Sequence, residues 1–423
     1  MAEEGYTVKD RVGWTDPASH ADQPDRADLV VVGAGTIGGW ASVFARADGA
    51  ERVIVLDRGH VGMGASSRAA GIVRAQGGTP ATVALGRWSI DFYSGQRAAY
   101  GTDSGFRELG YLILAVTEDD ELAGRERVAM QRANGLDVAW LDAATAAATA
   151  VTLSPDGHRG GSYVATDGAI DPPRNVRAYF LAMQAGGVEL REGTTFAALR
   201  TAPTRGATRV VAVETDRGTI ETDRVLLTGG PSLRAVGRAA GLRIPAGAAR
   251  HTVAVLEPNP AFDVPRMPMV FDIGAGLYWR LEEGGLLFGW SDPDERLGEA
   301  RSIDWAAYDR ARARLAAFVP ITRELELRRI WAATIDYTPD HLPIIGPALT
   351  PHGARIEGVT VASAGGHGMM WGPGVARVAA DLIASGRTSL TDVSDLGLDR
   401  FDARGRSRLA SDPIALPFPV NAE

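Results

Sequence analysis

The sequence contains no cysteine, and of its 44 basic residues only Lys9 is a lysine. Without cysteine the chain can form no disulfide, thiolate nucleophile, iron–sulfur cluster or thioether-linked cofactor. Because the single lysine stands near the N-terminus, chemistry in the rest of the chain has no lysine amine to use. Arginine therefore has to supply almost all of the positive charge.

Long apolar runs and clusters of positive charge are also missing. No stretch of about 18 uncharged apolar residues occurs, and the polar N-terminal segment lacks the apolar core of a signal peptide. The net charge is −8, and no block of Lys and Arg resembles a nucleic-acid footprint. We expect a soluble cytoplasmic protein that binds neither membranes nor nucleic acids, and we expect no bound metal.

The length and composition are those of an ordinary globular protein. The 423 residues, 45% of them hydrophobic, are enough for two to three domains' worth of chain around at least one large core. Residues 1–26 are polar and are predicted to form an N-terminal arm. Residues 389–423 are also polar, and we expect them to form a C-terminal tail on the surface.

The pattern of apolar residues predicts two kinds of sheet. The runs 27–32 and 52–56 flank a segment of small residues, and this order indicates a βαβ unit with a buried parallel sheet. Residues 241–329 contain alternating apolar strands, among them 252–256 and 285–290. Such alternation is typical of an antiparallel sheet.

A glycine motif stands between the first strand and the helix of the βαβ unit. Residues 33–38, Gly-Ala-Gly-Thr-Ile-Gly, fit the pattern G-x-G-x-x-G. Its glycines permit a tight turn and let the backbone approach a pyrophosphate, whose charge then lies against the helix N-terminus. Asp57 follows the second strand about 20 residues on, where its carboxylate can accept from ribose hydroxyls. Together these features predict a dinucleotide site.

Two further segments favour FAD over NAD. Residues 64–74 form a second loop of small residues and hydroxyls that can extend along a longer ligand. Near the C-terminus, the stretch 338–347 is followed by a strand at 359–363, the glycine turn 366–368 and a helix through 375–383. Such a helix start aims backbone N–H groups at an electron-rich group and would stabilise the negative charge of a reduced flavin.

These three segments together resemble the D-amino acid oxidase-like family of FAD-dependent oxidoreductases, in particular its sarcosine oxidase, dimethylglycine dehydrogenase and glycine oxidase branch. The resemblance covers about residues 27–386. It implies an α/β fold in which a discontinuous Rossmann-like FAD domain carries an α+β substrate domain built on an antiparallel sheet. The expected ranges are 27–103, 154–240 and 330–388 for the FAD-binding domain, and 104–153 and 241–329 for the substrate domain.

The resemblance also implies which residues contact the cofactor and the substrate. The expected catalytic residues are Arg74, His251, His367 and Tyr278. The expected FAD contacts are Gly33, Gly35, Thr36, Ile37, Gly38, Asp57, Arg58, Ser66, Ser67, Arg68, Ala70, Gly71, Ile72, Val188, Gly229, Gly230, Gly346, Gly366, His367, Gly368, Met369 and Met370.

Two positions depart from the family members that attach their flavin covalently. Ala333 aligns with the cysteine that carries the flavin in some members. Arg68 stands where dimethylglycine dehydrogenase-like members have a flavin-linked histidine before Ala-Ala-Gly. We therefore expect FAD to be bound noncovalently.

A third departure concerns the electron acceptor. Sarcosine oxidase-like members place a lysine over the flavin, where its charge helps oxygen accept electrons, and that position aligns with Leu287. Without the cation, negative charge on reduced oxygen loses a Coulomb partner, which favours a dehydrogenase that passes electrons to another carrier. The alternative is an oxidase that uses oxygen with the help of another cation, such as His251 or Arg250.

This chain has only some of the residues that bind substrate in the family that it resembles. Arg74 aligns with the arginine that binds the substrate carboxylate in sarcosine oxidase-like members, and an ion pair on the surface or in the flavin loop is its alternative role. Met370 replaces the second basic group of that clamp, and the arginines of glycine oxidase-like members align with Ile335 and Gly366. We expect a larger or less charged substrate than a small amino acid. Some of the nearby apolar residues would contact it and others would be core: Met369, Met370, Trp371, Tyr278, Trp279 and Trp290.

The leading hypothesis is oxidation of the CH–N bond of a secondary or tertiary amine, or of an N-substituted amino acid, by hydride transfer to flavin N5. This reaction requires an oriented C–H bond and an unprotonated amine, and no dedicated base. Oxidation of a hydroxy acid or alcohol would require a base, for which His251 and His367 are candidates with a pKa in range. A third alternative is a protein that binds FAD without turnover.

Overall fold

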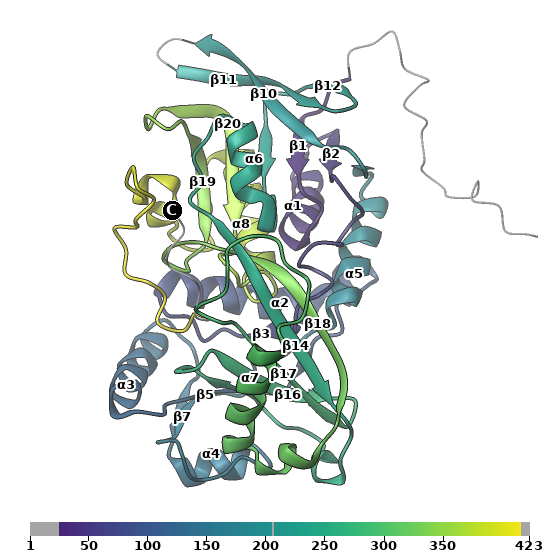
Figure 1. The fold of residues 1–423 in the computed structure, drawn as a ribbon. Coiled ribbons are helices and arrows are strands. Elements are labelled where there is room, and N and C mark those ends of the chain that lie inside the picture. The colour runs from purple at the N-terminus through teal and green to yellow at the C-terminus, as the bar shows by residue number, and fades with distance from the viewer. Residues whose placement is uncertain (1–24, 205–206, 416–423) are drawn as a thin grey trace, which may run out of the picture.

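The computed structural model describes residues 25–204 and 207–415, so most of the expected N-terminal arm lies outside the described residues. Two large sheets occupy the upper and lower halves of the view in Figure 1. The long strands β14 (Gly247–Leu256) and β18 (Leu327–Tyr337) run obliquely between the two halves. None of the helices in the described ranges is long and apolar enough to cross a membrane.

The first sheet contains the expected βαβ unit. β1 (Leu29–Val32) and β2 (Val53–Leu56) pair in parallel, and every residue of both strands is buried, which explains their continuous apolar sequence. Across the described part of this sheet the strands follow the order β10-β11-β20-β13-β1-β2-β9, with β12 paired to β11 and β19 paired to β20. Their bounds are β9 (Glu189–Arg191), β10 (Phe196–Thr204), β11 (Ala207–Thr215), β12 (Gly218–Glu221), β13 (Val225–Leu227), β19 (Ile344–Leu349) and β20 (Arg355–Ser363).

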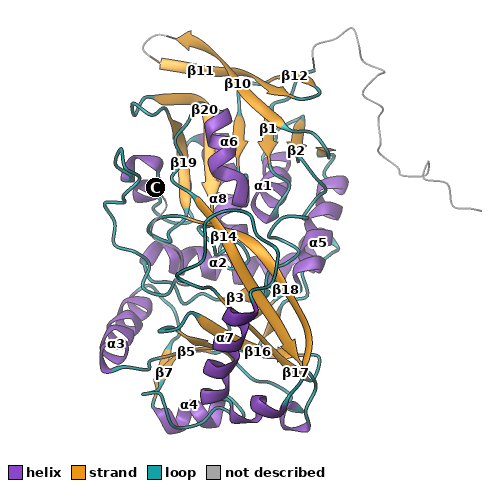
Figure 2. Cartoon of the chain, in the orientation of Figure 1, coloured by secondary structure: helices purple, strands orange, loops and turns teal. Residues whose placement is uncertain are grey.

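Helices cover both faces of this sheet (Figure 2). Alternate residues of β1 enter two different cores: Leu29 and Val31 join the core of the long helices, whereas Val30 and Val32 join the core that also holds Leu233. Trp40 and Trp371 lie in the first of these cores and are fully buried. The long helices are α1 (Thr36–Ala47), α2 (Pro80–Tyr100), α5 (Pro172–Ala185) and α8 (Gly372–Ser385), and Leu233 begins α6 (Leu233–Ala239).

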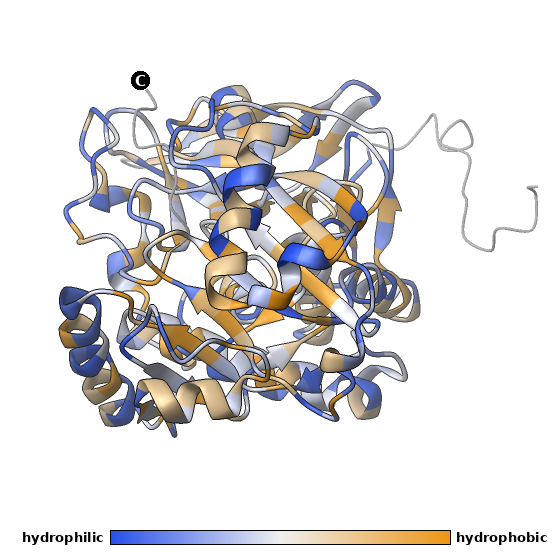
Figure 3. Cartoon of the chain, turned by 60° about the horizontal axis from the view of Figure 1, so that its bottom comes forward, coloured by the Kyte–Doolittle hydropathy of each residue, from blue (hydrophilic) through white to orange (hydrophobic). Residues whose placement is uncertain are grey.

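The second sheet is mostly antiparallel, as the alternating pattern predicts, and its strands follow the order β18-β14-β17-β16-β15-β5-β7-β6 in the described chain. Its remaining strands are β5 (Tyr111–Leu114), β6 (Ala139–Leu141), β7 (Gly161–Val164), β15 (Met269–Asp272), β16 (Leu277–Glu282) and β17 (Gly285–Trp290). Alternate residues of β5 and β15 enter two apolar clusters, one shared with the helix at 305–318 and the other next to the cavity described below. Figure 3 shows hydrophobic strands in the interior and helices of mixed hydropathy around them. The accompanying helices are α3 (Glu118–Ala133), α4 (Ala143–Thr149) and α7 (Trp305–Phe318).

A helix-covered parallel sheet together with an antiparallel sheet confirms the predicted fold class. Two strands pair within the second sheet although most of their residues fall in the ranges expected for the FAD-binding domain. β7 pairs with β5 in the second sheet although it falls within 154–240, and β18 pairs with β14 along almost its whole length although it begins near 330. Three short strands form a small third sheet in the order β3 (Ile72–Val73), β8 (Gly168–Ala169) and β4 (Arg107–Glu108).

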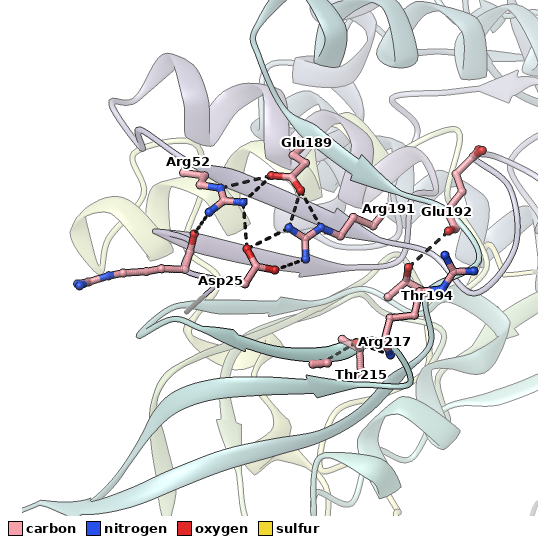
Figure 4. Close-up of polar contacts among 10 residues, drawn as sticks. Asp25, Arg52, Glu189, Arg191, Glu192, Thr194, Thr215 and Arg217 are labelled. Carbon is pink, nitrogen blue, oxygen red and sulfur yellow. Dashed lines mark hydrogen bonds and ion pairs between the residues drawn. The ribbon is translucent and has the colours of Figure 1, made fainter. Parts of the chain in front are cut away.

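The start of the described chain is fixed to the edge of the first sheet by ion pairs (Figure 4). Asp25 pairs with Arg52 at 3.0 Å and also with Arg191, and both arginines pair with Glu189. Burial by itself would raise the pKa of Asp25, but its hydrogen bond and charge contacts with the two arginines hold that pKa below its ordinary value. The network joins the segment before β1 to β2 and β9.

Candidate active site

A cavity lies between the start of α1, the loop 62–74 and the face of the second sheet. The empty space within it, open mouth included, is about 1340 Å³, and its lining combines backbone of the glycine loops with side chains of β14 and β16. Among the described residues that line it, Arg74 is the only arginine, and the histidines are His251 and His367. The cavity therefore joins the predicted dinucleotide loop to most of the predicted catalytic residues.

One end of the cavity is built for a phosphate. Gly33 has φ +103°, and a Cβ on Gly38 would lie 1.9 Å from the Gly33 carbonyl oxygen, so the turn requires glycine at both positions. α1 begins here without a side-chain cap and without an acidic residue in its first turn. The Thr36 N–H donates to Ser66 Oγ at 3.0 Å, which ties the second loop to the helix start. An anion at this end would meet free N–H groups and the positive end of the helix dipole.

Asp57 stands at the end of β2 and shapes the same turn. Its Oδ2 accepts from the Ala34 N–H at 2.9 Å and its Oδ1 accepts from the Gly59 N–H at 2.8 Å. Each carboxylate oxygen keeps a further lone pair toward the cavity that it lines. Asp57 can therefore accept from ribose hydroxyls while it holds the glycine loop in place.

These features fit a dinucleotide such as FAD. The glycine positions leave a cradle that a Cβ would fill, and a polar loop continues from it toward the second sheet. At the far end, the turn 366–370 lines the cavity ahead of α8, so the backbone of this turn can face an electron-rich group. In the first turn of α8 itself, Pro373 has no N–H and the Gly374 N–H donates to Ser89 Oγ at 3.1 Å.

His251 and Tyr278 form a hydrogen-bonded pair on the wall opposite the dinucleotide loop. His251 Nε2 lies 2.5 Å from the Tyr278 hydroxyl, and His251 Nδ1 lies 2.9 Å from Ser291 Oγ. Ser291 Oγ is in turn 2.9 Å from the Tyr337 hydroxyl. Four side chains from β14, β16, β18 and the end of β17 thus make one continuous chain of hydrogen bonds.

The two cavity members of this chain are both neutral. Burial lowers the pKa of His251 to about 4, and burial together with the neighbouring tyrosines raises the pKa of Tyr278 well above its ordinary value. Burial and the nearby Arg74 charge likewise lower the pKa of His367, whose Nδ1 donates to the Gly365 carbonyl oxygen at 3.2 Å. The expectation that one of these histidines has a base pKa near neutrality is therefore not met, because the cavity desolvates both rings.

Arg74 is buried near His367 and Tyr111 and does not lie in a surface ion pair. Its Nη1 donates to the Gln76 carbonyl oxygen, its Nη2 donates to the Ile414 carbonyl oxygen at 2.9 Å, and its Nε is buried without a hydrogen-bond partner among the described residues. Its guanidinium also lies over the Tyr111 ring, 5.9 Å from the ring centroid. Because the side chain is almost completely buried, its charge favours an anionic group of a ligand through the field in the cavity and not through an exposed donor.

The cavity brings together all four expected catalytic residues and most of the expected cofactor contacts. Those that line it are Gly33, Gly35, Thr36, Ile37, Gly38, Asp57, Ser66, Ala70, Gly71, Ile72, Gly229, Gly230, Gly366, His367, Gly368, Met369 and Met370. Five expected contacts lie elsewhere. Arg58 is exposed and pairs with Glu299, Val188 is buried in the core of the long helices, and Gly346 lies in β19. Ser67 and Arg68 line a second, more open recess on the other side of the loop.

The cavity also contains residues that the sequence analysis did not select. Some adjoin the motifs and could have been found from that position, namely Ala34, Gly62, Gly64, Ala65, Ala69, Thr228, Pro231 and Ala364. Ala333 and Ile335 were considered only as replaced family positions, and both line the cavity, as does Asp336 next to them. Tyr111, Phe271 and Ile414 carry no local sequence signal, because only the packing of distant segments brings them here.

The fold and the two-ended cavity define a dinucleotide-dependent enzyme, and comparison with known proteins identifies its family. The family model of FAD-dependent oxidoreductases matches residues 28–382, and the chain belongs to this family. This membership confirms the predicted resemblance and FAD as the cofactor.

The relatives of the chain include proteins with names from the predicted branch. It is 28% identical over 403 residues to 4-methylaminobutanoate oxidase (formaldehyde-forming) of Paenarthrobacter nicotinovorans, a match that covers 92% of this chain and 47% of the relative. It is 24% identical to sarcosine oxidase subunit beta of Rhodobacter capsulatus, covering 92% of each chain. The structure of glycine oxidase from Geobacillus kaustophilus superposes with a TM-score of 0.75 at 25% identity, covering 89% of this chain and all of that one. The chain spans about half the length of the first of these relatives.

Proposed function

We propose that the protein oxidises the CH–N bond of a secondary or tertiary amine or an N-substituted amino acid, with noncovalent FAD as the cofactor. FAD, when bound, supplies the acceptor for the hydride. The observation that carries the proposal is the arrangement of one buried arginine and one neutral His–Tyr pair around a single cavity next to the dinucleotide loop. Relatives named as oxidases of 4-methylaminobutanoate and sarcosine support it.

The cavity residues suit an amine that must react unprotonated. The Arg74 cation and the desolvated surroundings both disfavour a second positive charge, so they lower the pKa of a bound ammonium. The Tyr278 hydroxyl, held by its hydrogen bond to His251 Nε2, keeps a lone pair that can accept a hydrogen bond from the bound amine and orient it. The buried Arg74 charge at the cavity wall favours a substrate that carries a carboxylate, and such a group would orient the reacting C–H bond.

Two observations favour this proposal over its two alternatives, which are oxidation of a hydroxy acid or alcohol and FAD binding without turnover. That reaction needs a base to take the hydroxyl proton, and the low pKa of His251 and of His367 makes both poor proton acceptors at neutral pH. A protein that binds FAD without turnover would not need a buried cation and a buried His–Tyr pair on the cavity wall away from the glycine loop.

We propose an electron acceptor other than oxygen. Leu287, which aligns with the oxygen-activating lysine, is buried among apolar side chains. Neither alternative cation supports an oxidase: His251 is neutral, and Arg250 is held by Glu295 at 2.7 Å and does not line the cavity. Arg74 is the remaining cation at the cavity, and we assign it a role in substrate binding. The cytoplasmic location expected from the sequence is part of the same proposal.

An anaerobic titration of the holoenzyme tests the function. N-methylglycine and 4-methylaminobutanoate are added to separate samples, and 2-hydroxy acids of the same chain lengths serve as controls. We expect an N-methyl amino acid to bleach the flavin and the hydroxy acids to leave it yellow. Bleaching by the hydroxy acids alone would contradict the proposal. Admission of air then separates the acceptors, because slow return of colour is expected for a dehydrogenase.

Acid precipitation tests how the cofactor is held. We expect all of the flavin to stay in the supernatant when the holoenzyme is denatured in acid. A yellow pellet would contradict noncovalent binding. We expect noncovalent binding because Arg68 cannot form the histidyl bond to flavin and because Ala333, in the cavity wall, offers no sulfur.

A further inference from the structure

An acidic side chain that the proposed reaction does not use lies in the cavity wall. Asp336 is the second-last residue of β18, and among the described residues that line the cavity the only other acid is Asp57. Asp57 belongs to the dinucleotide turn. Asp336 instead lies beside the turn 366–370, since a Cβ on Gly366 would lie 3.3 Å from the Asp336 carbonyl oxygen. This acid is therefore next to the turn that we expect to face the flavin.

The protein satisfies only one oxygen of the Asp336 carboxylate. Oδ2 accepts from Ser363 Oγ at 2.6 Å, and Ser363 Oγ accepts in turn from the Gly365 N–H at 3.1 Å. Oδ1 has no hydrogen-bond partner in any other described residue, and the side chain keeps some accessible surface although it lies deep in the fold. One oxygen is thus tied to the glycine turn, and the other is open toward the cavity.

Asp340, four residues further on, is a buried acid with the opposite environment. Arg400 Nε lies 2.7 Å from its Oδ2 and Arg400 Nη2 lies 3.0 Å from its Oδ1. Burial by itself would raise the pKa of Asp340, but the contacts with Arg400 hold that pKa below its ordinary value. The ion pair also fixes the described part of the C-terminal segment to the stretch 338–347, beside β19 in Figure 1, although the sequence analysis expected this segment on the surface.

No ionic partner of Asp336 occurs among the described residues, although charged side chains lie on the elements around β18. Arg250 on β14 pairs with Glu295 at 2.7 Å. Glu299, in the segment before α7, pairs with Arg58 at 2.7 Å. These charges are therefore already compensated by one another.

The other titratable groups around Asp336 are neutral at pH 7. Burial lowers the pKa of His341 and of His367 and raises the pKa of Tyr337. The Arg74 charge acts on His367 and is not among the influences on Asp336. Burial raises the pKa of Asp336 itself, against the lowering effect of the hydrogen bond to its Oδ2. Negative charge added to the cavity would raise that pKa further, because no cation compensates it.

We propose that Asp336 takes up a proton from solvent when the bound flavin is reduced and releases it when the flavin is reoxidised. A hydride brings two electrons and one proton, so the cofactor gains one negative charge on reduction. A solvent proton that joins Asp336 Oδ1 turns the carboxylate into a carboxylic acid and cancels this charge. It returns to solvent when the two electrons and the hydride's proton leave the flavin. The inference goes beyond the proposed function, because any two-electron donor can reduce the flavin.

The pH dependence of the flavin midpoint potential tests the inference without substrate. The potential of the holoenzyme is measured against reference dyes from pH 5 to pH 9, and its slope gives the number of protons taken up per two electrons. We expect the wild type to take up about one proton more than Asp336→Asn within a limited pH window. Below the window the carboxyl is protonated in both redox states, and above it the carboxyl is ionised in both.

Two further variants separate proton uptake from a structural role. Ser363→Ala removes the hydrogen bond that stabilises the carboxylate, so the window should move to higher pH while the extra proton remains. Glu295→Gln neutralises an acid that does not line the cavity, and its window should coincide with that of the wild type.

The outcomes also separate this inference from the proposed function. Equal slopes in the wild type and Asp336→Asn at every pH would overturn it, even if the variant binds FAD less tightly. If Asp336→Asn does not retain FAD, the other profiles decide: a constant slope in the wild type, or an unmoved window in Ser363→Ala, would equally overturn it. If the extra proton is found but no N-methyl amino acid bleaches the flavin, the role of Asp336 stands and the proposed reaction is wrong.

Discussion

The His251 imidazole reaches the Tyr278 hydroxyl across a strand that lies between them. His251 is on β14 and Tyr278 is on β16, and β17 pairs with both strands. At the crossing point β17 has Gly289, whose Cβ, if it had one, would lie 2.1 Å from the Tyr278 hydroxyl oxygen. A missing side chain on the middle strand thus permits a 2.5 Å hydrogen bond between its neighbours.

Tyr278→Phe should slow amine oxidation. The variant keeps the ring but removes the hydroxyl that accepts from the substrate and donates to His251, so we expect kcat to fall by about 10- to 100-fold. The rate of anaerobic flavin reduction in a stopped-flow instrument measures it. An unchanged rate in a variant with full FAD content would show that the hydroxyl has no part in the reaction.

Gly289→Ala should damage the same pair without altering either member. The added methyl group has to displace the Tyr278 ring, and overpacking of this kind costs about 1–3 kcal/mol. We expect a lower melting temperature and a loss of activity similar to that of Tyr278→Phe. As a control, the double variant Gly289→Ala with Tyr278→Phe should be no slower than either single variant, because both changes act on one interaction.

Asp167→Asn should change how stability depends on pH. Burial raises the pKa of Asp167 to about 7, against the lowering effect of the Ala75 N–H and of the Arg74 charge. Between its ordinary pKa and about 7 the folded state binds a proton that the unfolded state lacks, so this group makes the protein less stable as pH rises. The melting temperature of the variant minus that of the wild type should therefore increase from pH 5 to pH 8.

The control for this pH effect is Asp142→Asn. The Thr145 N–H holds the pKa of the exposed Asp142 below its ordinary value, so this carboxylate stays ionised over the same range. Its difference in melting temperature should be the same at pH 5 and pH 8. A flat difference for Asp167→Asn as well would contradict the assigned pKa.

Gly35→Ala should separate cofactor binding from folding. A Cβ at Gly35 would meet only Ser66 Oγ, at 3.2 Å, so the apoprotein should fold, but the methyl group would project toward the pyrophosphate position. We expect FAD affinity to fall by at least about tenfold while the melting temperature of the apoprotein changes little. Gly38→Ala is the contrasting variant, because its Cβ would lie 1.9 Å from the Gly33 carbonyl oxygen and should prevent folding of the loop.

Local sequence was sufficient for the cofactor half of the site. The runs around β1 and β2, the glycines at 33, 35 and 38, and Asp57 are all close in the chain, so their spacing alone indicates the turn that they form. The same holds for the turn 366–370 before α8. Expected contacts such as Val188 and Gly346 came from the resemblance alone, and the structure places both outside the cavity lining.

The substrate half depended on contacts between distant segments. His251, Tyr278 and Arg74 could be selected from the sequence, but the neutral state of the first two and the buried position of Arg74 follow from the packing of distant segments. Gly289 gives no local signal of its role, and Ile414 reaches Arg74 from 340 residues away. The sequence by itself therefore determined the family, the cofactor and the phosphate loop, which depend on short-range spacing and on glycine backbone geometry. Only the tertiary structure decided which groups face the substrate, because that follows from how β14, β16, β17 and the C-terminal segment pack together.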